Sequence, residues 1–191
     1  MRAAAAILGM ALAWPAPAAD WLRVAQVLAD PGSTVRVPVR VRDLGASLLN
    51  EGDGPDREIQ SFAFQVVFPA THVDGIGFDH AGVTAGRTAF FSQVTPAADN
   101  LYVLKAFDEA SNPLAFTLDA PAPGNTIGEL VVTIDPATPI GSAIPLQLQN
   151  FNAALIDDSA TESETVANGH LLLVDGLIII GPDAIFASSF E

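Results

Sequence analysis

The chain has 191 residues, with 22 acidic against 8 basic side chains, no cysteine and a formal net charge of −14. A surface this acidic repels phosphate backbones and anionic lipid, which argues against binding to nucleic acid or to a membrane surface. Because no disulfide can form, a hydrophobic core has to hold the fold, and a chain of this size can bury one.

The first 19 residues have the layout of a secretory signal peptide. A basic start at Arg2 precedes an apolar stretch at 3–14, and the small residues of 15–19 suit cleavage by a signal peptidase. The alternative, an N-terminal membrane anchor, needs roughly 20 apolar residues, and this run is shorter. We therefore predict cleavage after Ala18 or Ala19 and a mature chain that is extracellular or periplasmic and not inserted in a membrane.

Apolar residues then alternate with polar ones along most of the chain, between turns rich in proline and glycine. A period of two is typical of strands with one buried face. The segment 125–155 is interpreted as two such strands joined by a proline-marked turn at 135–141. Pro38 cannot donate to a sheet ladder, so it marks an edge strand or a bulge. The expected strands are 21–29, 34–42, 59–68, 72–78, 88–94, 101–107, 112–116, 126–135, 144–149 and 166–174.

About nine short strands and no convincing helix predict an all-β fold, an antiparallel sandwich. We divide the chain into the signal peptide (1–19), one sandwich domain (20–175) and a C-terminal tail (176–191).

Residues that could carry catalysis are sparse. The histidines match no metal motif, no Gly-x-Ser-x-Gly turn occurs, and the acidic clusters 108–109, 157–158 and 162–164 are interpreted as solvated loops. We predict no catalytic residues, no cofactor and no metal site, and therefore not an enzyme. One alternative stays open at the glycine-containing acidic loop 50–58, whose carboxylates and carbonyls are the ligands that calcium prefers.

The order of several segments is similar to that of a known family. Val37-Pro38-Val39 is followed by the strand 61–69, then by 102–107, 127–134, the turn 139–142 and the ending 168–171. This series resembles the cohesin domain, and more broadly the related carbohydrate-binding sandwich modules, over about 25–174. One departure is Phe68-Pro69-Ala70, where the family usually has a Tyr-Asp-Pro-like segment.

The resemblance implies an Ig-like jelly-roll sandwich of about nine strands that acts as a secreted, non-catalytic, monomeric binding module. In that family a flat sheet face built from the third, fifth, sixth and eighth strands receives a helical protein partner. A partner that is another secreted or surface protein is therefore expected, with a link to polysaccharide utilisation. The positions implied for the face are Ala63, Gln65, Val67, Val131 and Thr133, with Lys105 at its edge.

Two alternatives concern that face. A loop or the C-terminal tail could cover it. A carbohydrate-binding module would instead hold polysaccharide on exposed aromatic rings, for which Phe90, Phe91 and Tyr102 are the candidates. Because neighbours in a strand point to opposite faces, we expect one of Phe90 and Phe91 in the core and the other exposed.

The ending 185–191, Ile-Phe-Ala-Ser-Ser-Phe-Glu, is similar to short C-terminal endings on exported proteins of some Gram-negative bacteria. We interpret the tail as either a sorting signal or a segment that packs as a terminal strand.

Overall fold

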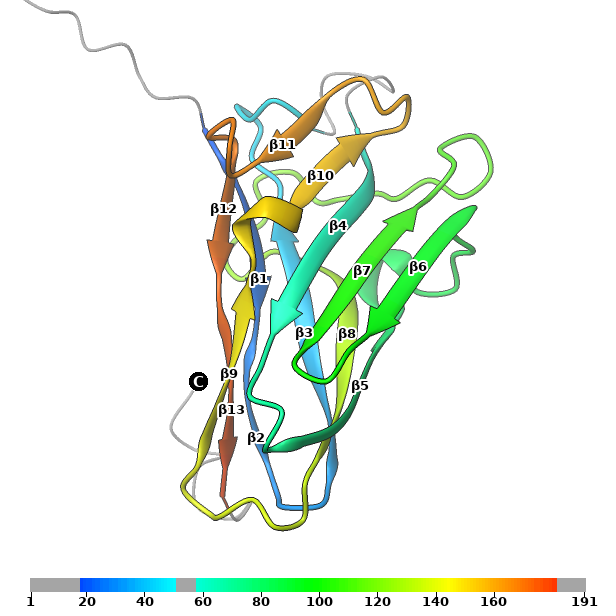
Figure 1. Ribbon diagram of the computed structural model, residues 1–191. Coiled ribbons are helices and arrows are strands. Elements are labelled where there is room, and N and C mark those ends of the chain that lie inside the picture. The colour runs from blue at the N-terminus through cyan, green and yellow to red at the C-terminus, as the bar shows by residue number, and fades with distance from the viewer. Residues whose placement is uncertain (1–17, 51–57, 182–191) are drawn as a thin grey trace, which may run out of the picture.

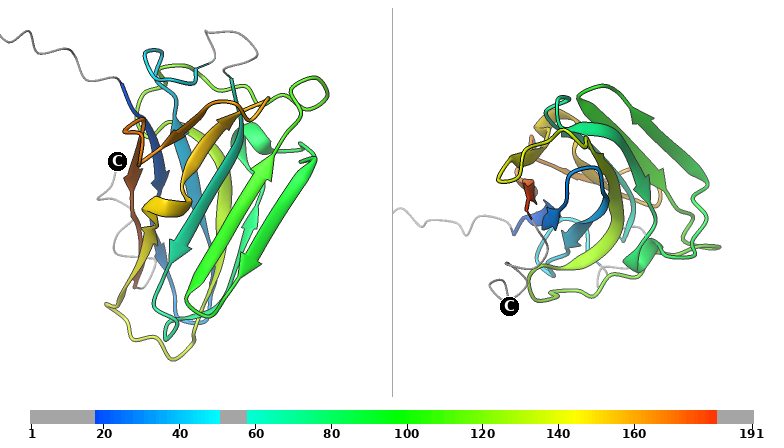
Figure 2. Two further views of the ribbon diagram at one scale, coloured as in Figure 1. Left: turned by 45° about the horizontal axis from the view of Figure 1, so that its top comes forward. Right: turned by 90° about the horizontal axis from the view of Figure 1, so that it is seen from below.

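The computed structural model describes residues 18–50 and 58–181, which form two β-sheets packed face to face (Figures 1 and 2). The five-stranded sheet has the order β12 (Leu171–Val174), β1 (Asp20–Val24), β3 (Thr34–Arg42), β8 (Asn125–Ile134) and β5 (Val73–Asp79). The predicted all-β sandwich is confirmed.

The eight-stranded sheet is built around β4 (Ile59–Val67). On one side β4 pairs with β7 (Asn100–Ala106), which pairs in turn with β6 (Phe91–Pro96). On its other side it pairs with β10 (Ala154–Asp157) and with the end of β9 (Ala143–Leu148). The sheet continues to β11 (Ser163–Thr165) beyond β10, and to β13 (Gly176–Ile180) and β2 (Gln26–Ala29) beyond β9. Two short 3-10 helices are η2 (Gly82–Thr84) and η3 (Asn150–Asn152).

The core lies between the sheets and consists of the residues whose alternation predicted strands. Val37, Val39 and Val41 of β3 are fully buried, while Arg36, Arg40 and Arg42, at the alternate positions, point outward. Opposite them, the rings of Phe62 and Phe64 meet the ring of Phe78 edge-on, with centroids 6.0 and 5.7 Å apart. Aromatic rings in this arrangement attract one another beyond the burial of their area.

Several expected features of the strand pattern differ in the structure. The segments on either side of the 135–141 turn, β8 and β9, are both strands, but they lie in different sheets, so the turn crosses from one layer to the other. The strand expected at 21–29 is divided into β1 and β2, which also lie in different sheets. The strand expected at 88–94 runs instead over β6, no strand forms at 112–116, and β10 and β11 were not expected. The sheets are also mixed, because β1 pairs with β12 and β2 with β13 in parallel.

Pro38 lies in the interior of its sheet, since β3 is flanked by β1 and β8. The expected edge strand is therefore wrong, and a bulge is present next to Pro38, where the register shifts between Val39 and Arg40. Gly128 pairs with Val39 at this point, and a Cβ on it would lie 2.0 Å from Cζ of Phe78. Only glycine fits there, because the ring already fills the space.

The segment 176–180, left open as a sorting or packing segment, is strand β13. It pairs with β9 on one side and with β2 on the other, and it buries Ile178 and Ile180. The sandwich therefore extends to Ile180. The predicted signal peptide up to residue 17, most of the loop considered for calcium (51–57) and the ending 182–191 lie outside the described residues. Within the described ranges, no helix is long and apolar enough to cross a membrane.

Candidate partner-binding face

Four neighbouring strands, β10, β4, β7 and β6, present one continuous outward face, which we call the β4–β7 face. Strand alternation decides which residues lie on it. Phe62, Phe64 and Val66 of β4 are buried between the sheets, so the residues between them point away from the core. The side chains of the face are Ile156, Ala154, Ser61, Ala63, Gln65, Val67, Tyr102, Leu104, Ala106, Phe91, Gln93 and Thr95.

The centre of this face has low relief. Strand register places its side chains in rows across the sheet, and the two central rows are Ile156–Ser61–Ala106–Phe91 and Ala154–Ala63–Leu104–Gln93. Alanine and serine occupy half of these positions, so little projects above the backbone in the middle. A flat, mostly apolar patch of this kind is typical of protein interaction sites rather than of enzyme clefts.

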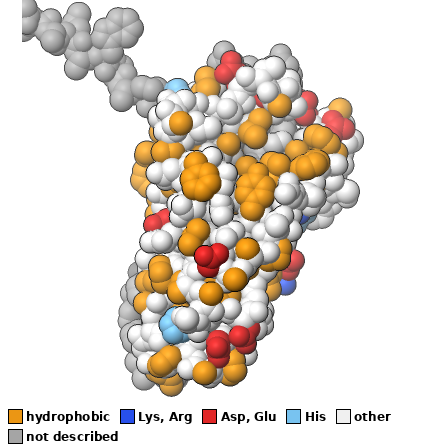
Figure 3. Space-filling model, in the orientation of Figure 1, with side chains coloured by type: hydrophobic (Ala, Val, Ile, Leu, Met, Phe, Trp, Pro, Cys, Tyr) orange, Lys and Arg blue, Asp and Glu red, His pale blue; other side chains and the backbone are white. Residues whose placement is uncertain are grey.

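Two exposed phenylalanines flank the low centre. Phe91 on β6 is 48% exposed, and Phe151 in η3 is 78% exposed. Asn152 Nδ2 donates to Oε1 of Gln65, and Gln149 N donates to the Gln65 carbonyl at 2.9 Å, which holds η3 against β4. Figure 3 shows hydrophobic side chains gathered over the middle and upper part of this side of the molecule. Aromatic side chains, phenylalanine included, are enriched in protein interfaces relative to the rest of the surface.

The six residues predicted for the face do not share one surface. Ala63, Gln65 and Val67 lie on the β4–β7 face. Val131 and Thr133 point outward from β8, which belongs to the other sheet, so their placement with β4 is wrong. An amphipathic pattern gives the inward and outward sides of a strand but not the sheet that the strand joins.

Lys105 does not lie at an exposed edge either. It is on the inward side of β7, only 7% exposed, and its Nζ donates to Oγ of Ser92 at 2.7 Å. The ammonium group lies 5.9 Å from the ring centroid of Phe78, and burial lowers the pKa of Lys105. Lys105 therefore closes the open side of the sandwich between β6 and β5 rather than presenting a charge to a partner.

The residues that complete the β4–β7 face were missed by sequence reasoning. Ala154 and Ile156 belong to β10, and Phe151 belongs to η3, neither of which was expected. The available signal was weak: Leu155 is the buried member of a strand of only four residues. Such a short strand shows too few alternations to be recognised.

The aromatic candidates for sugar binding do not form a row. Phe90 and Phe91 are both exposed, at 70% and 48%, so the expectation that one of them is in the core is wrong. Phe90 precedes β6 and Phe91 begins it on the outward side, so strand alternation does not apply to the pair. Along the hairpin Phe91 pairs with Ala106 and Tyr102 with Thr95, four positions apart, which separates the rings' Cα atoms by about 13 Å.

Two acidic side chains interpreted as solvated are in fact buried. Asp157 accepts hydrogen bonds from Thr161 N and Oγ1, both at 2.8 Å, and from Glu162 N at 3.1 Å, which order the turn after β10. Glu164 is fully buried beside Asp20, the first residue of β1. Burial, and next the charge of Glu164, raise the pKa of Asp20 to about 9. Burial also raises the pKa of Glu164, so both carboxyl groups of this pair are harder to ionise than exposed ones.

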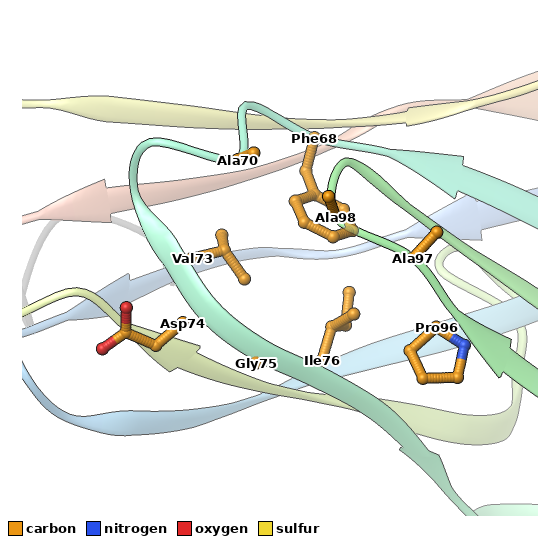
Figure 4. A pocket seen from close by; sticks show the side chains of 9 residues that line it. All are labelled: Phe68, Ala70, Val73, Asp74, Gly75, Ile76, Pro96, Ala97 and Ala98. Carbon is orange, nitrogen blue, oxygen red and sulfur yellow. The ribbon is translucent and has the colours of Figure 1, made fainter.

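A pocket of about 530 Å³ lies between β5, the segment after β4 and the β6–β7 turn. Its lining is largely apolar, with Phe68, Val73 and Ile76 pointing toward one another, while the carboxylate of Asp74 points away from them (Figure 4). No charged group is directed into it in this view, so its chemistry suits an apolar side chain better than a reaction. Among the described residues, no group of three or more His, Asp or Glu side chains could hold a metal ion.

No protein-family model and no curated protein sequence matches the chain. Solved cohesin structures, however, match nearly all of it. The sixth cohesin of scaffoldin B from Acetivibrio cellulolyticus, solved in complex with a dockerin, is 17% identical with a TM-score of 0.60, over 85% of this chain and 99% of that one. The seventh type I cohesin of ScaB from Pseudobacteroides cellulosolvens is 12% identical with a TM-score of 0.58, over 91% and 99%.

A cohesin in a type I cohesin–dockerin complex from Clostridium thermocellum is similar to the same degree, with 15% identity and a TM-score of 0.58 over 85% of this chain and 99% of that one. Sequence identities this low establish a similarity of fold and nothing more. Together with the two packed sheets, they identify this chain as a cohesin-like β-sandwich.

Proposed function

We propose that this protein is a non-catalytic recognition module whose β4–β7 face binds a partner protein. The observation that carries the proposal is the low centre of Ala63, Ala106 and Ala154 between the exposed rings of Phe91 and Phe151. Burying that apolar surface against a partner is favourable at about 25 cal/mol per Å² of apolar area. Ala63, Gln65 and Val67 contact the partner, whereas Lys105, Val131 and Thr133 do not.

Two further points support a protein partner. The fold neighbours from A. cellulolyticus and C. thermocellum were solved in complex with dockerins, which are proteins. The carbohydrate alternative is disfavoured because Phe91 and Tyr102 are too far apart along the hairpin to stack neighbouring sugar rings.

The proposed function also includes export of the protein from the cytoplasm. Residues 1–19 act as the signal peptide, and the mature module works as a monomer outside the cytoplasm, at or beyond the cell surface, with a link to polysaccharide utilisation. The apolar stretch 3–14 followed by small residues at 15–19 supports cleavage near Ala19.

Capture from the organism's own secreted proteins tests the face. Leu104→Arg places a charge in the centre of the β4–β7 face, and Thr133→Arg places the same charge on the outward side of β8. The immobilised Thr133→Arg variant is expected to retain the same stoichiometric protein as the wild type, with or without excess soluble polysaccharide. The Leu104→Arg variant is expected to lose it, because an arginine there would be buried without a partner charge.

Retention of the same protein by both variants would show that the partner binds elsewhere. Loss of retention when polysaccharide is added would instead assign the surface to sugar. Circular dichroism of both variants serves as the control that each sandwich remains folded.

A further inference from the structure

Four of the six basic side chains in the described part of this acidic protein lie on one side of it. Although the whole chain carries a formal charge of −14, four of its arginines lie on the outward side of β1 and β3 in the five-stranded sheet, facing away from the β4–β7 face. The basic residues in the described part of the chain are Arg23, Arg36, Arg40, Arg42, Arg87 and Lys105.

Two of these arginines face each other without a counter-ion. Arg23 of β1 pairs directly with Arg40 of β3 across the ladder. Like charges at directly opposed positions destabilise a sheet. Within the described residues neither side chain forms an ion pair or donates a hydrogen bond, and the buried Nε of Arg23 has no partner. Burial and then the charge of Arg23 lower the pKa of Arg40.

Arg36 lies on the same face of the same strand and shows the contrast. Its guanidinium group contacts Asp79 at 2.9 Å and Glu129 at 3.1 Å, so its charge is already neutralised. Among the described residues, carboxylates therefore pair with one end of the arginine row and none pairs with the other. A carboxylate from another molecule would therefore be attracted most strongly to the unneutralised end, at Arg23 and Arg40.

Apolar side chains border that end. Trp21 pairs with Leu172 on one side and with Arg42 on the other, and Trp21 and Leu172 are 38% and 48% exposed. Arg42 is held in place by its Nε, which donates to the carbonyl of Ala120 at 3.0 Å. Figure 1 shows that β12, β1 and β3, which carry these residues, run side by side. The surface thus combines fixed cations with an exposed apolar pair.

We propose that this second surface, formed by Trp21, Arg23, Arg40, Arg42 and Leu172, binds an acidic peptide segment that carries a hydrophobic residue. A carboxylate between Arg23 and Arg40 accepts bonds from both guanidinium groups and removes their mutual repulsion. The hydrophobic residue of the segment covers Trp21 and Leu172. The surface acts independently of the β4–β7 face, because it belongs to the other sheet.

The pairing of Leu172 with Trp21 favours a peptide over an acidic polysaccharide. A sugar ring can stack on an indole, but a uronate chain has no side chain with which to cover an exposed leucine. Nucleic acid fits this surface less well than a peptide does, because the other, strongly acidic surfaces would repel a long phosphate backbone.

The proposal is tested with a short synthetic peptide of alternating Asp and Leu. Its binding to the full chain is measured by fluorescence anisotropy. The Arg23→Gln/Arg40→Gln variant is expected to bind at least about tenfold more weakly than the wild type. The matched control Arg36→Gln, which changes the same residue type on the same face, is expected to bind as the wild type does. A peptide of alternating Asn and Leu should bind at least about tenfold more weakly than the Asp–Leu peptide. Added salt should weaken the binding of the Asp–Leu peptide only.

Three results would overturn the proposal: no binding of the Asp–Leu peptide by the wild type, equal binding by the double variant, or displacement of the peptide by polygalacturonate at equal carboxylate concentration. The last would assign the surface to an acidic polysaccharide. Thermal unfolding separates binding from folding, since the double variant removes a repulsion and should melt no lower than the wild type.

Discussion

At the scale of single residues, the least expected feature is the buried carboxyl pair of Asp20 and Glu164. Asp20 Oδ1 accepts from Leu44 N and Glu164 Oε1 accepts from Leu49 N, both at 2.9 Å, so the pair ties β1 and β11 to the segment that leads from β3. Burial raises the pKa of both groups. The pair is therefore structural, and its cost depends on pH.

The Asp20→Asn variant is expected to change that pH dependence. Because the pKa of Asp20 is raised from 3.8 in the unfolded chain to about 9, its contribution to stability is full below pH 3.8 and is lost as the pH rises toward 9. Between these limits the unfolding free energy of the wild type should fall relative to that of Asp20→Asn as the pH rises, by at most about 1.4 kcal/mol per pH unit. Urea unfolding at pH 5, 7 and 9 measures this, and parallel curves for the two proteins would contradict it.

At the scale of secondary-structure elements, the sandwich depends on strands close to its two ends. β13 lies between β9 and β2, and β12 pairs in parallel with β1, so each sheet joins an early strand to a late one. β13 contributes to the core through Ile178 and Ile180, which are buried against the other layer. Loss of this late strand would leave β9 and β2 unpaired on that side and expose part of the core.

A pair of neighbouring substitutions in β13 tests its place in the core. Ile178→Ala removes a fully buried side chain and is expected to cost about 2–5 kcal/mol of unfolding free energy. Ile179→Ala changes the same residue type on the outward side, where the loss should stay below about 1.5 kcal/mol because the side chain is only half-buried. Chemical denaturation of both variants measures the difference. Equal losses would mean that β13 does not alternate as described.

At the scale of the whole molecule, charge is distributed unevenly. Arginines gather on β1 and β3, so acidic side chains dominate the rest of the surface of a chain with a net charge of −14. Repulsion among those acidic groups opposes the compact state, and salt at about 0.1–0.15 M largely screens it between exposed charges more than about 8–10 Å apart.

The melting temperature is therefore expected to rise when sodium chloride is raised from about 0.02 M to about 0.3 M at neutral pH, since exposed acidic groups are screened first. Differential scanning fluorimetry measures the shift. An acidic pH near the sequence pI of about 4.2 serves as the control, because the net repulsion is small there and salt should have little effect. A melting temperature that is independent of salt at neutral pH would contradict the expectation.

The fold class and the inward side of most strands could be predicted from the order of residues, because a period of two follows directly from strand geometry. Val37, Val39 and Val41 are buried as their spacing predicted, and so are Leu130, Val132 and Ile134. The order of segments also led to the cohesin-like sandwich. Ala63, Gln65 and Val67 could be placed on the outward side of β4 for the same reason.

Which strands share a sheet, in contrast, depends on pairing between distant segments and could not be predicted from the local pattern. Val131 and Thr133 have the same outward alternation as Gln65, yet β8 joins the opposite layer, and no local pattern carries that information. The same holds for side chains that depend on distant partners. Lys105 points inward, where it donates to Ser92 and lies near the ring of Phe78. Glu164 is buried beside Asp20. Arg23 lies opposite Arg40 because β1 pairs with β3. Long-range pairing, rather than local alternation, makes each of these contacts.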